Sequence, residues 1–84
     1  MAHGTAAQIR AARALLNWRL STLADTAGVS EAAVRSAERD GRSVRGATLR
    51  AIILALEEAG VLFIEPGEVS PSAGPGVRLR QRAS

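Results

Sequence analysis

The chain has 84 residues and a formal net charge of +3, and this length allows a single domain with a modest core. It contains no cysteine, which excludes disulfide frameworks and thiolate metal sites. No apolar run approaches the roughly 20 residues of a membrane span, and the N-terminus lacks the pattern of a signal peptide. We therefore expect a cytoplasmic protein with no membrane partner.

Arginine supplies every basic side chain, and its excess over acidic residues is a weak indication of a polyanionic partner. Trp18 and Phe63 are the only aromatic residues, too few for the stacking platforms that bind single-stranded nucleic acid. His3 is the only histidine, and no carboxylates have metal-ligand spacing. The sequence therefore predicts no enzyme, no metal site and no cofactor.

The first predicted helix runs from Ala6 to about Leu16. Thr5 and Gln8 have the spacing of a capping box at its start. Arg10 and Arg13 lie elsewhere on the helix surface. Four apolar residues at helical spacing predict one buried face: Ile9, Ala12, Leu15 and Leu16.

Two short helices follow, from Leu20 to Ala27 and from Glu31 to about Arg39. Gly28 ends the first because glycine tolerates positive φ, and Ser30 caps the second. A helix pair with so tight a turn needs a small residue at the crossing and apolar residues that lock the helices together. Six residues meet these needs: Leu23, Ala24, Gly28, Val29, Val34 and Ala37. Such a pair presents its second helix as a rod that fits the major groove of B-DNA.

A turn at Asp40-Gly41 and a loop to Gly46 lead to a fourth predicted helix. Thr48 is its predicted cap, and the helix runs from Leu49 to Ala59. Its apolar stripe comprises Leu49, Ile52, Ile53 and Leu56, whereas Leu54 lies on a different side. Either this helix is fully buried or Leu54 lies in a subunit interface, and we favour the interface.

Two apolar runs near the C-terminus predict strands, Val61 to Ile64 and Val77 to Arg80, joined by a loop rich in Pro, Gly and Ser. A lone hairpin is marginally stable in water. It therefore packs on the helices or extends a sheet with a second chain. Both faces of the first strand are apolar, which favours cover on both sides.

The segment from Leu20 to Arg39 resembles the helix-turn-helix of the phage-repressor-like regulators, the Cro/C1 or XRE family. The resemblance extends from about Ile9 to Leu56. It rests on Trp18, Leu23-Ala24, Ala27-Gly28-Val29-Ser30, Val34, Glu38-Arg39 and Gly41. The C-terminal runs look like a short bacterial branch in which four helices precede a β-hairpin.

The resemblance implies a mainly α fold in two parts. Residues 1–60 form a four-helix, helix-turn-helix DNA-binding domain, and residues 61–84 form a β-hairpin that serves as a dimerisation element. The predicted dimer interface comprises Leu54, Leu62, Phe63, Ile64, Val77 and Leu79.

The resemblance also implies that the recognition helix begins at Ser30. The candidates for reading bases are Ser30, Glu31, Ala32, Arg35, Ser36 and Arg39. Arg35 is the best of these, since a guanidinium bridges O6 and N7 of guanine, and Glu31 can accept from cytosine. The candidates for phosphate contacts are Arg19, Arg42 and Arg45, which set affinity without reading sequence.

Two further residues have structural interpretations. We interpret Glu38 as a member of a solvated ion-pair cluster with Arg35 and Arg39. Trp18 is interpreted as a plug under the helix pair.

The leading hypothesis is a homodimeric, sequence-specific regulator of transcription that binds double-stranded DNA, most simply as a repressor. The alternative is a protein-interaction module of the same fold, such as an antitoxin or anti-activator that binds a toxin or the transcription machinery. A third possibility is a non-specific architectural DNA-binding protein.

Overall fold

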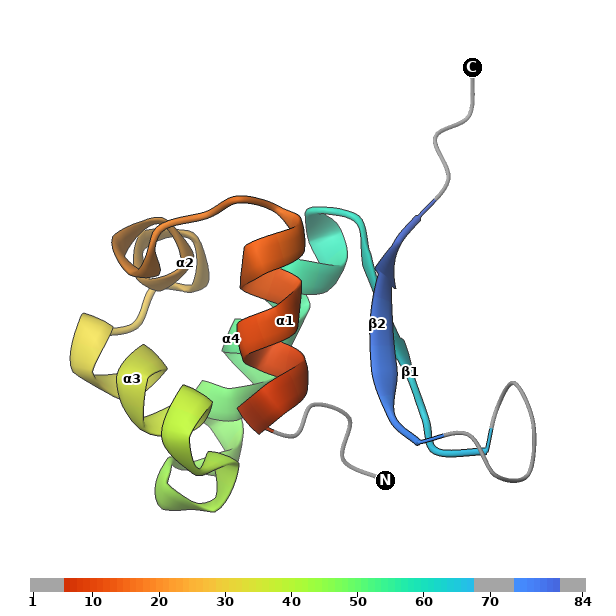
Figure 1. The fold of residues 1–84 in the computed structure, drawn as a ribbon. Helices are drawn as coiled ribbons and strands as arrows, with labels where there is room; N and C mark the ends of the chain where they lie inside the picture. The colour runs from red at the N-terminus through yellow and green to blue at the C-terminus, as the bar shows by residue number, and fades with distance from the viewer. Residues whose placement is uncertain (1–5, 68–73, 81–84) are drawn as a thin grey trace.

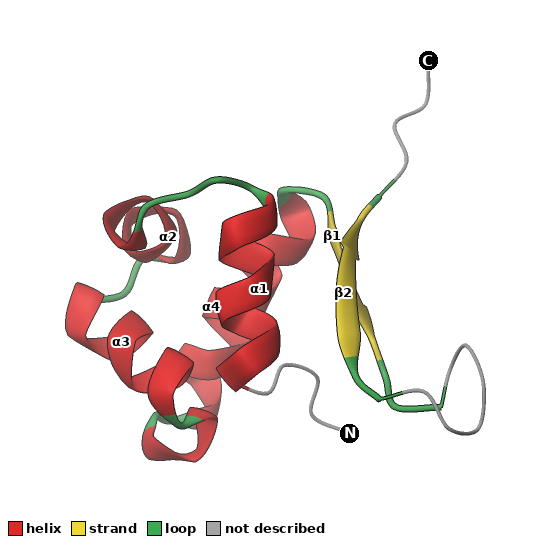
Figure 2. Ribbon diagram, in the orientation of Figure 1, coloured by secondary structure: helices red, strands yellow, loops and turns green. Residues whose placement is uncertain are grey.

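A computed structural model of the chain describes residues 6–67 and 74–80. Figures 1 and 2 show a group of packed helices with a β-hairpin lying against one side. The elements in chain order are α1 (Ala6–Leu15), α2 (Leu20–Ala27), α3 (Glu31–Arg39), the 3-10 turn η1 (Gly41–Ser43), α4 (Gly46–Glu58), β1 (Val61–Ile64) and β2 (Gly76–Leu79). The predicted fold, mainly α with a C-terminal hairpin, is confirmed.

One hydrophobic core joins the four α-helices and the hairpin. Its buried members are Ile9, Ala12, Leu23, Ala24, Val34, Ala37, Ile52, Ala55, Leu56 and Val61. Trp18 is partly buried and packs against this core, as a plug would. Since α1, α2 and α4 all contribute buried residues to this core, α3 packs on them through its inner side. The outer side of α3 is not needed to form the core.

Helix α1 ends where Asn17 adopts the left-handed conformation with φ of 56°. Asparagine tolerates this region better than most residues, so it suits the end of a helix. Leu15 is 42% exposed, so the prediction that it belongs to the buried face is wrong. Thr5, the predicted cap of this helix, lies outside the described residues.

Helix α4 begins at Gly46, and the prediction that Thr48 caps it is wrong. The residue at the N-cap is Arg45, whose side chain makes no capping hydrogen bond. The segment before α4 has its own cap: the Asp40 side chain accepts a hydrogen bond from the Arg42 N–H at 3.0 Å at the start of η1. Leu54 is 53% exposed, so α4 is not buried on all sides.

The two strands pair antiparallel within one chain, with Val61 opposite Leu79 and Phe63 opposite Val77. Val61 is fully buried, and Phe63 and Val77 pack against the core, so this face of the hairpin covers the helices. Leu62 and Ile64 alternate with these residues and belong to the opposite face. Figure 1 shows the hairpin lying along one side of the helices.

Gln8 ties α1 to the hairpin. Its Nε2 donates hydrogen bonds to the carbonyl oxygens of Ile64 at 3.1 Å and Gly76 at 2.9 Å. Gln8 is only 6% exposed, and a buried amide without hydrogen-bond partners would destabilise the fold. The hairpin is therefore fixed by polar bonds as well as by the apolar contacts of Val61.

Candidate nucleic-acid interface

The turn between α2 and α3 is built from local signals. Gly28 has φ of +73°, a left-handed conformation that glycine adopts without steric cost. The Val29 N–H then donates to the Ala24 carbonyl at 3.0 Å and closes the end of α2. Val29 itself packs against the core and is partly buried. The chain leaves α2 in a fixed direction and enters α3 after two more residues.

Helix α3 begins with a side-chain cap. The Ser30 Oγ accepts a hydrogen bond from the Ala33 N–H at 3.0 Å, and Ser30 has the extended backbone of an N-cap. Across the helix pair, Leu23, Val34 and Ala37 are fully buried. The N-terminal end of α3 is therefore anchored by a cap and by apolar contacts to α2.

The outer side of α3 is open to solvent. Glu31, Ala32, Arg35 and Arg39 are exposed, and we call these four residues the α3 ridge. Ser36 is half-buried, and its carbonyl accepts from the Asp40 N–H at 2.8 Å. Figure 1 shows α3 on the side of the helices that lies away from the hairpin.

Glu31 and Arg35 form an ion pair along the ridge. The Arg35 Nη2 lies 3.7 Å from the Glu31 Oε1, one helical turn apart. The Arg35 side chain is 63% exposed and the Glu31 side chain is 51% exposed, so both groups are accessible to a ligand in solvent.

Three further exposed arginines lie on other elements. Arg19 precedes α2, Arg42 lies in η1, and Arg45 stands at the N-cap of α4. The Arg42 side chain is 97% exposed and reaches Asp40 only at 4.0 Å. The Arg42 guanidinium is thus free to reorient toward an anionic surface.

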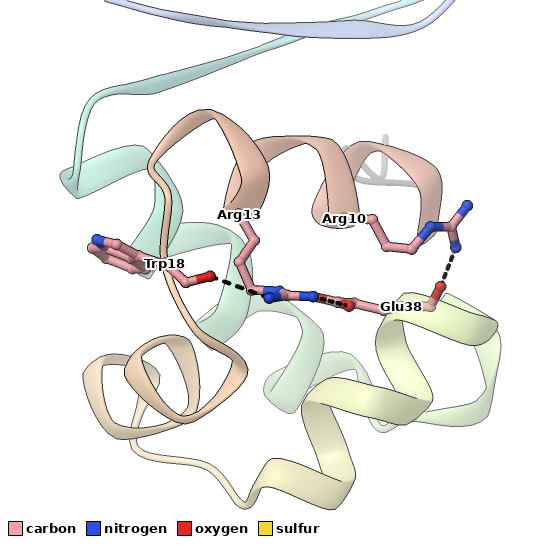
Figure 3. A network of polar contacts seen from close by, with 4 residues as sticks. All are labelled: Arg10, Arg13, Trp18 and Glu38. Carbon is pink, nitrogen blue, oxygen red and sulfur yellow. Dashed lines mark hydrogen bonds and ion pairs between the residues drawn. The ribbon is translucent and has the colours of Figure 1, made fainter.

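The rear of α3 is held by an ion pair that sequence analysis missed (Figure 3). Arg13 of α1 donates from Nε to the Glu38 Oε2 at 2.7 Å and from Nη2 to the Glu38 Oε1 at 3.0 Å. Arg13 also donates to the Trp18 carbonyl at 3.1 Å, and Arg10 donates to the Glu38 carbonyl. These contacts join α1, the segment after it, and the C-terminal turn of α3.

The interpretation of Glu38 as a solvated ion-pair residue is wrong. Glu38 is 8% exposed, and its partner is Arg13 rather than Arg35 or Arg39. The hydrogen bonds to Glu38 raise the pKa of Arg13 above its ordinary value, although burial acts in the opposite direction. The bidentate geometry leaves both carboxylate oxygens satisfied, as a buried charge requires.

Sequence comparison agrees with this geometry. A helix-turn-helix family model, HTH_3, matches residues 9–59, which is more than half of the chain and contains α2, the turn and α3. The chain belongs to the XRE-type helix-turn-helix family. It is a DNA-binding regulator of the XRE kind. No curated protein matches the chain significantly.

Within residues 6–67 and 74–80, no group of three or more acidic or histidine side chains is arranged to hold a metal ion. None of the helices in the same residues is long and apolar enough to cross a membrane.

Proposed function

We propose that this XRE-type protein binds a specific operator in double-stranded DNA as a homodimer and represses transcription from it. The observation that carries the proposal is the division of α3 into two sides. Its rear is fixed by Val34, Ala37 and the Arg13–Glu38 pair, whereas the ridge is exposed. A rigid helix with one open face is what insertion into a major groove requires.

Base reading is proposed for the exposed ridge and for Ser30. Arg35 is the principal reader, because a guanidinium makes two hydrogen bonds to guanine. Ala32 offers a methyl group for a thymine methyl, and Arg39 lies one turn beyond Arg35. We give Ser36 a smaller role than the sequence suggested, since its side chain is half-buried.

Phosphate binding is proposed for Arg19, Arg42 and Arg45. Contacts to phosphate fix the orientation of the protein on the duplex and release counterions, so they dominate the salt dependence. An operator occupied in this way blocks access of the transcription machinery, and this is the basis for proposing repression.

Dimerisation is proposed through apolar side chains that the monomer covers only in part or not at all. Leu54 and Leu79 are 53% and 47% exposed, and Leu62 and Ile64, on the outer face of the hairpin, are half-buried. Phe63 and Val77 pack against their own core, so we give them a supporting role. Two copies joined about a twofold axis place two recognition helices on a palindromic site, roughly 34 Å apart.

Selection of binding sites from random duplex DNA tests the proposed function. We expect enrichment of one palindromic sequence and a stoichiometry of two chains per duplex. Recovery of unenriched DNA at near-physiological salt contradicts sequence-specific regulation and favours an architectural DNA-binding protein.

The dimer is tested by sedimentation of Leu54→Glu and Leu62→Glu beside the parent protein. If a patch forms the dimer interface, the glutamate introduced into it lowers the dimer fraction. If the parent sediments as a monomer at tens of micromolar, with and without operator, the homodimer is wrong. Exposed Leu54 then favours the second candidate, a module that binds another protein.

A further inference from the structure

The α3 ridge carries little net charge for a surface that enters a polyanion. Glu31 opposes Arg35 directly, and Asp40 follows Arg39 at the end of the helix. The other glutamate of α3, Glu38, is buried and neutralised by Arg13. Glu31 is therefore the one carboxylate on the ridge itself, beside Arg35 and Arg39, and the arginines proposed for phosphate binding lie on other elements.

A carboxylate is an unfavourable group for non-specific binding to DNA. Duplex DNA carries one negative charge per roughly 1.7 Å of its axis. A carboxylate brought into the groove also loses water, and this loss is costly unless the group is paired. In the free protein, Glu31 has one cationic neighbour at 3.7 Å, the Arg35 guanidinium.

Arg35 cannot serve two partners equally. When its guanidinium turns to the O6 and N7 of a guanine, its interaction with Glu31 weakens. Glu31 then needs another donor, and the only base that offers an exocyclic amine without an adjacent acceptor in the major groove is cytosine, through N4. Both side chains have hydrogen-bond partners together only where the DNA presents a guanine and a cytosine within reach of two residues that lie one turn of α3 apart.

We propose that Glu31 is a specificity-determining residue that acts as a filter on Arg35. On non-cognate DNA, Arg35 stays with Glu31, and the carboxylate is repelled by the phosphates. On the cognate site, guanine binds Arg35 and cytosine binds Glu31, so the two residues read their bases as one unit. The substrate of this unit is a G/C-containing step in each half-site. This inference rests on the proposed function.

The test measures the affinity of parent and Glu31→Gln proteins for the selected operator and for random duplex, over a series of salt concentrations. Glutamine keeps the size of the side chain and removes its charge. We expect the affinity for random duplex to rise about fivefold, since one repulsive charge is lost. We expect the ratio of specific to random affinity to fall by about tenfold or more, since the cytosine contact is weakened.

Glu58→Gln is the matched control, because it removes the same charge from the exposed C-terminal turn of α4, next to β1. An equal rise in random-duplex affinity for both variants overturns the filter, since the effect is then one of net charge. Unchanged specificity in Glu31→Gln also overturns it.

A double-mutant cycle with Arg35→Ala tests the joint reading. We expect the losses in specific affinity to be less than additive, because either change disables the same unit. Strict additivity means that the two residues act independently and rejects the proposal. Failure of the parent protein to prefer any sequence is a different result, which rejects the proposed function itself.

Discussion

Helix α3 carries two glutamates that pair with arginine, one near each end, and the two pairs lie in different environments. Glu38 is buried, and Arg13 binds it through two hydrogen bonds of 2.7 and 3.0 Å from another helix. Glu31 is exposed, and Arg35 approaches it to 3.7 Å from the same helix. The same pair of residue types fixes the helix at one end and remains available to a ligand at the other.

Burial explains this difference. A charge removed from water must be paired for the fold to form, so Glu38 and Arg13 have no freedom to exchange partners. An exposed ion pair contributes only about 0–1 kcal/mol to stability, so Arg35 can leave Glu31 at small cost. The comparison predicts that changes to the first pair alter stability, whereas changes to the second alter recognition.

The largest expected effect is on folding. Glu38→Ala removes the carboxylate that pairs with the Arg13 guanidinium and leaves it only the Trp18 carbonyl as an acceptor, and we expect it to lower the free energy of unfolding by about 2–4 kcal/mol. The lower part of this range applies if the Arg13 side chain, 27% exposed, recovers water. Urea unfolding followed by circular dichroism measures the change.

The double variant Arg13→Met, Glu38→Leu is the control for this prediction. It removes both charges together, so we expect it to be more stable than Glu38→Ala. A double variant that is no more stable than Glu38→Ala contradicts the view that the unpaired charge is the cause.

The pH dependence of stability follows from the same pair. The folded protein raises the pKa of Arg13. The free energy that this shift contributes is fully present below the pKa of arginine in the unfolded chain. It is lost only as pH rises through the higher pKa of the folded protein. Arg13 therefore contributes no step to unfolding curves around neutral pH, and a step there must come from another group.

The second expected effect is on DNA. Arg35→Ala should weaken binding to the selected operator by about 1–3 kcal/mol and relax the preference at one base pair. Unfolding free energy should stay near that of the parent, because the side chain is 63% exposed. Competition binding with single-base operator variants measures the change.

Arg45→Ala is the matched arginine variant for comparison with Arg35→Ala. It should weaken operator and random duplex alike and reduce the slope of log affinity against log salt by about 1. An unchanged base preference in Arg35→Ala would falsify its assignment as the reader.

A smaller effect is expected at the start of α3, the end that carries the exposed pair. Ser30→Ala removes the hydrogen bond from the Ala33 N–H and should cost about 1 kcal/mol of stability. Thr26→Ala is the control, since that hydroxyl donates to the Thr22 carbonyl within α2 and caps no free donor. Equal effects of the two substitutions count against a capping role for Ser30.

The sequence was informative where the determining residues are close together in the chain. Gly28 and Ser30 predicted the end of α2 and the start of α3 correctly, because a positive φ and a cap are properties of one or two residues. The hairpin was also predicted from its local apolar runs, and its second strand begins one residue early, at Gly76. The exposed ridge follows from helical periodicity once α3 is located.

The sequence was misleading where the partner is distant. Glu38 has arginines three positions before it and one position after it, yet it pairs with Arg13, 25 residues away. Gln8 likewise binds carbonyl groups 56 and 68 residues away, in Ile64 and Gly76. No periodicity within one helix carries such information, so the pairing that fixes the recognition helix emerges only from tertiary structure.

The smallest expected effect is the stability change of Glu31→Gln, and it is the most direct test of the comparison. The exposed pair at 3.7 Å should contribute no more than about 0.5 kcal/mol, so unfolding of this variant should match the parent closely. A loss as large as that of Glu38→Ala means that Glu31 fixes the helix as well, and the division of α3 into an anchored end and a recognition end fails. A near-zero change combined with altered DNA selectivity separates the two roles, because the same substitution then leaves folding intact and affects only recognition.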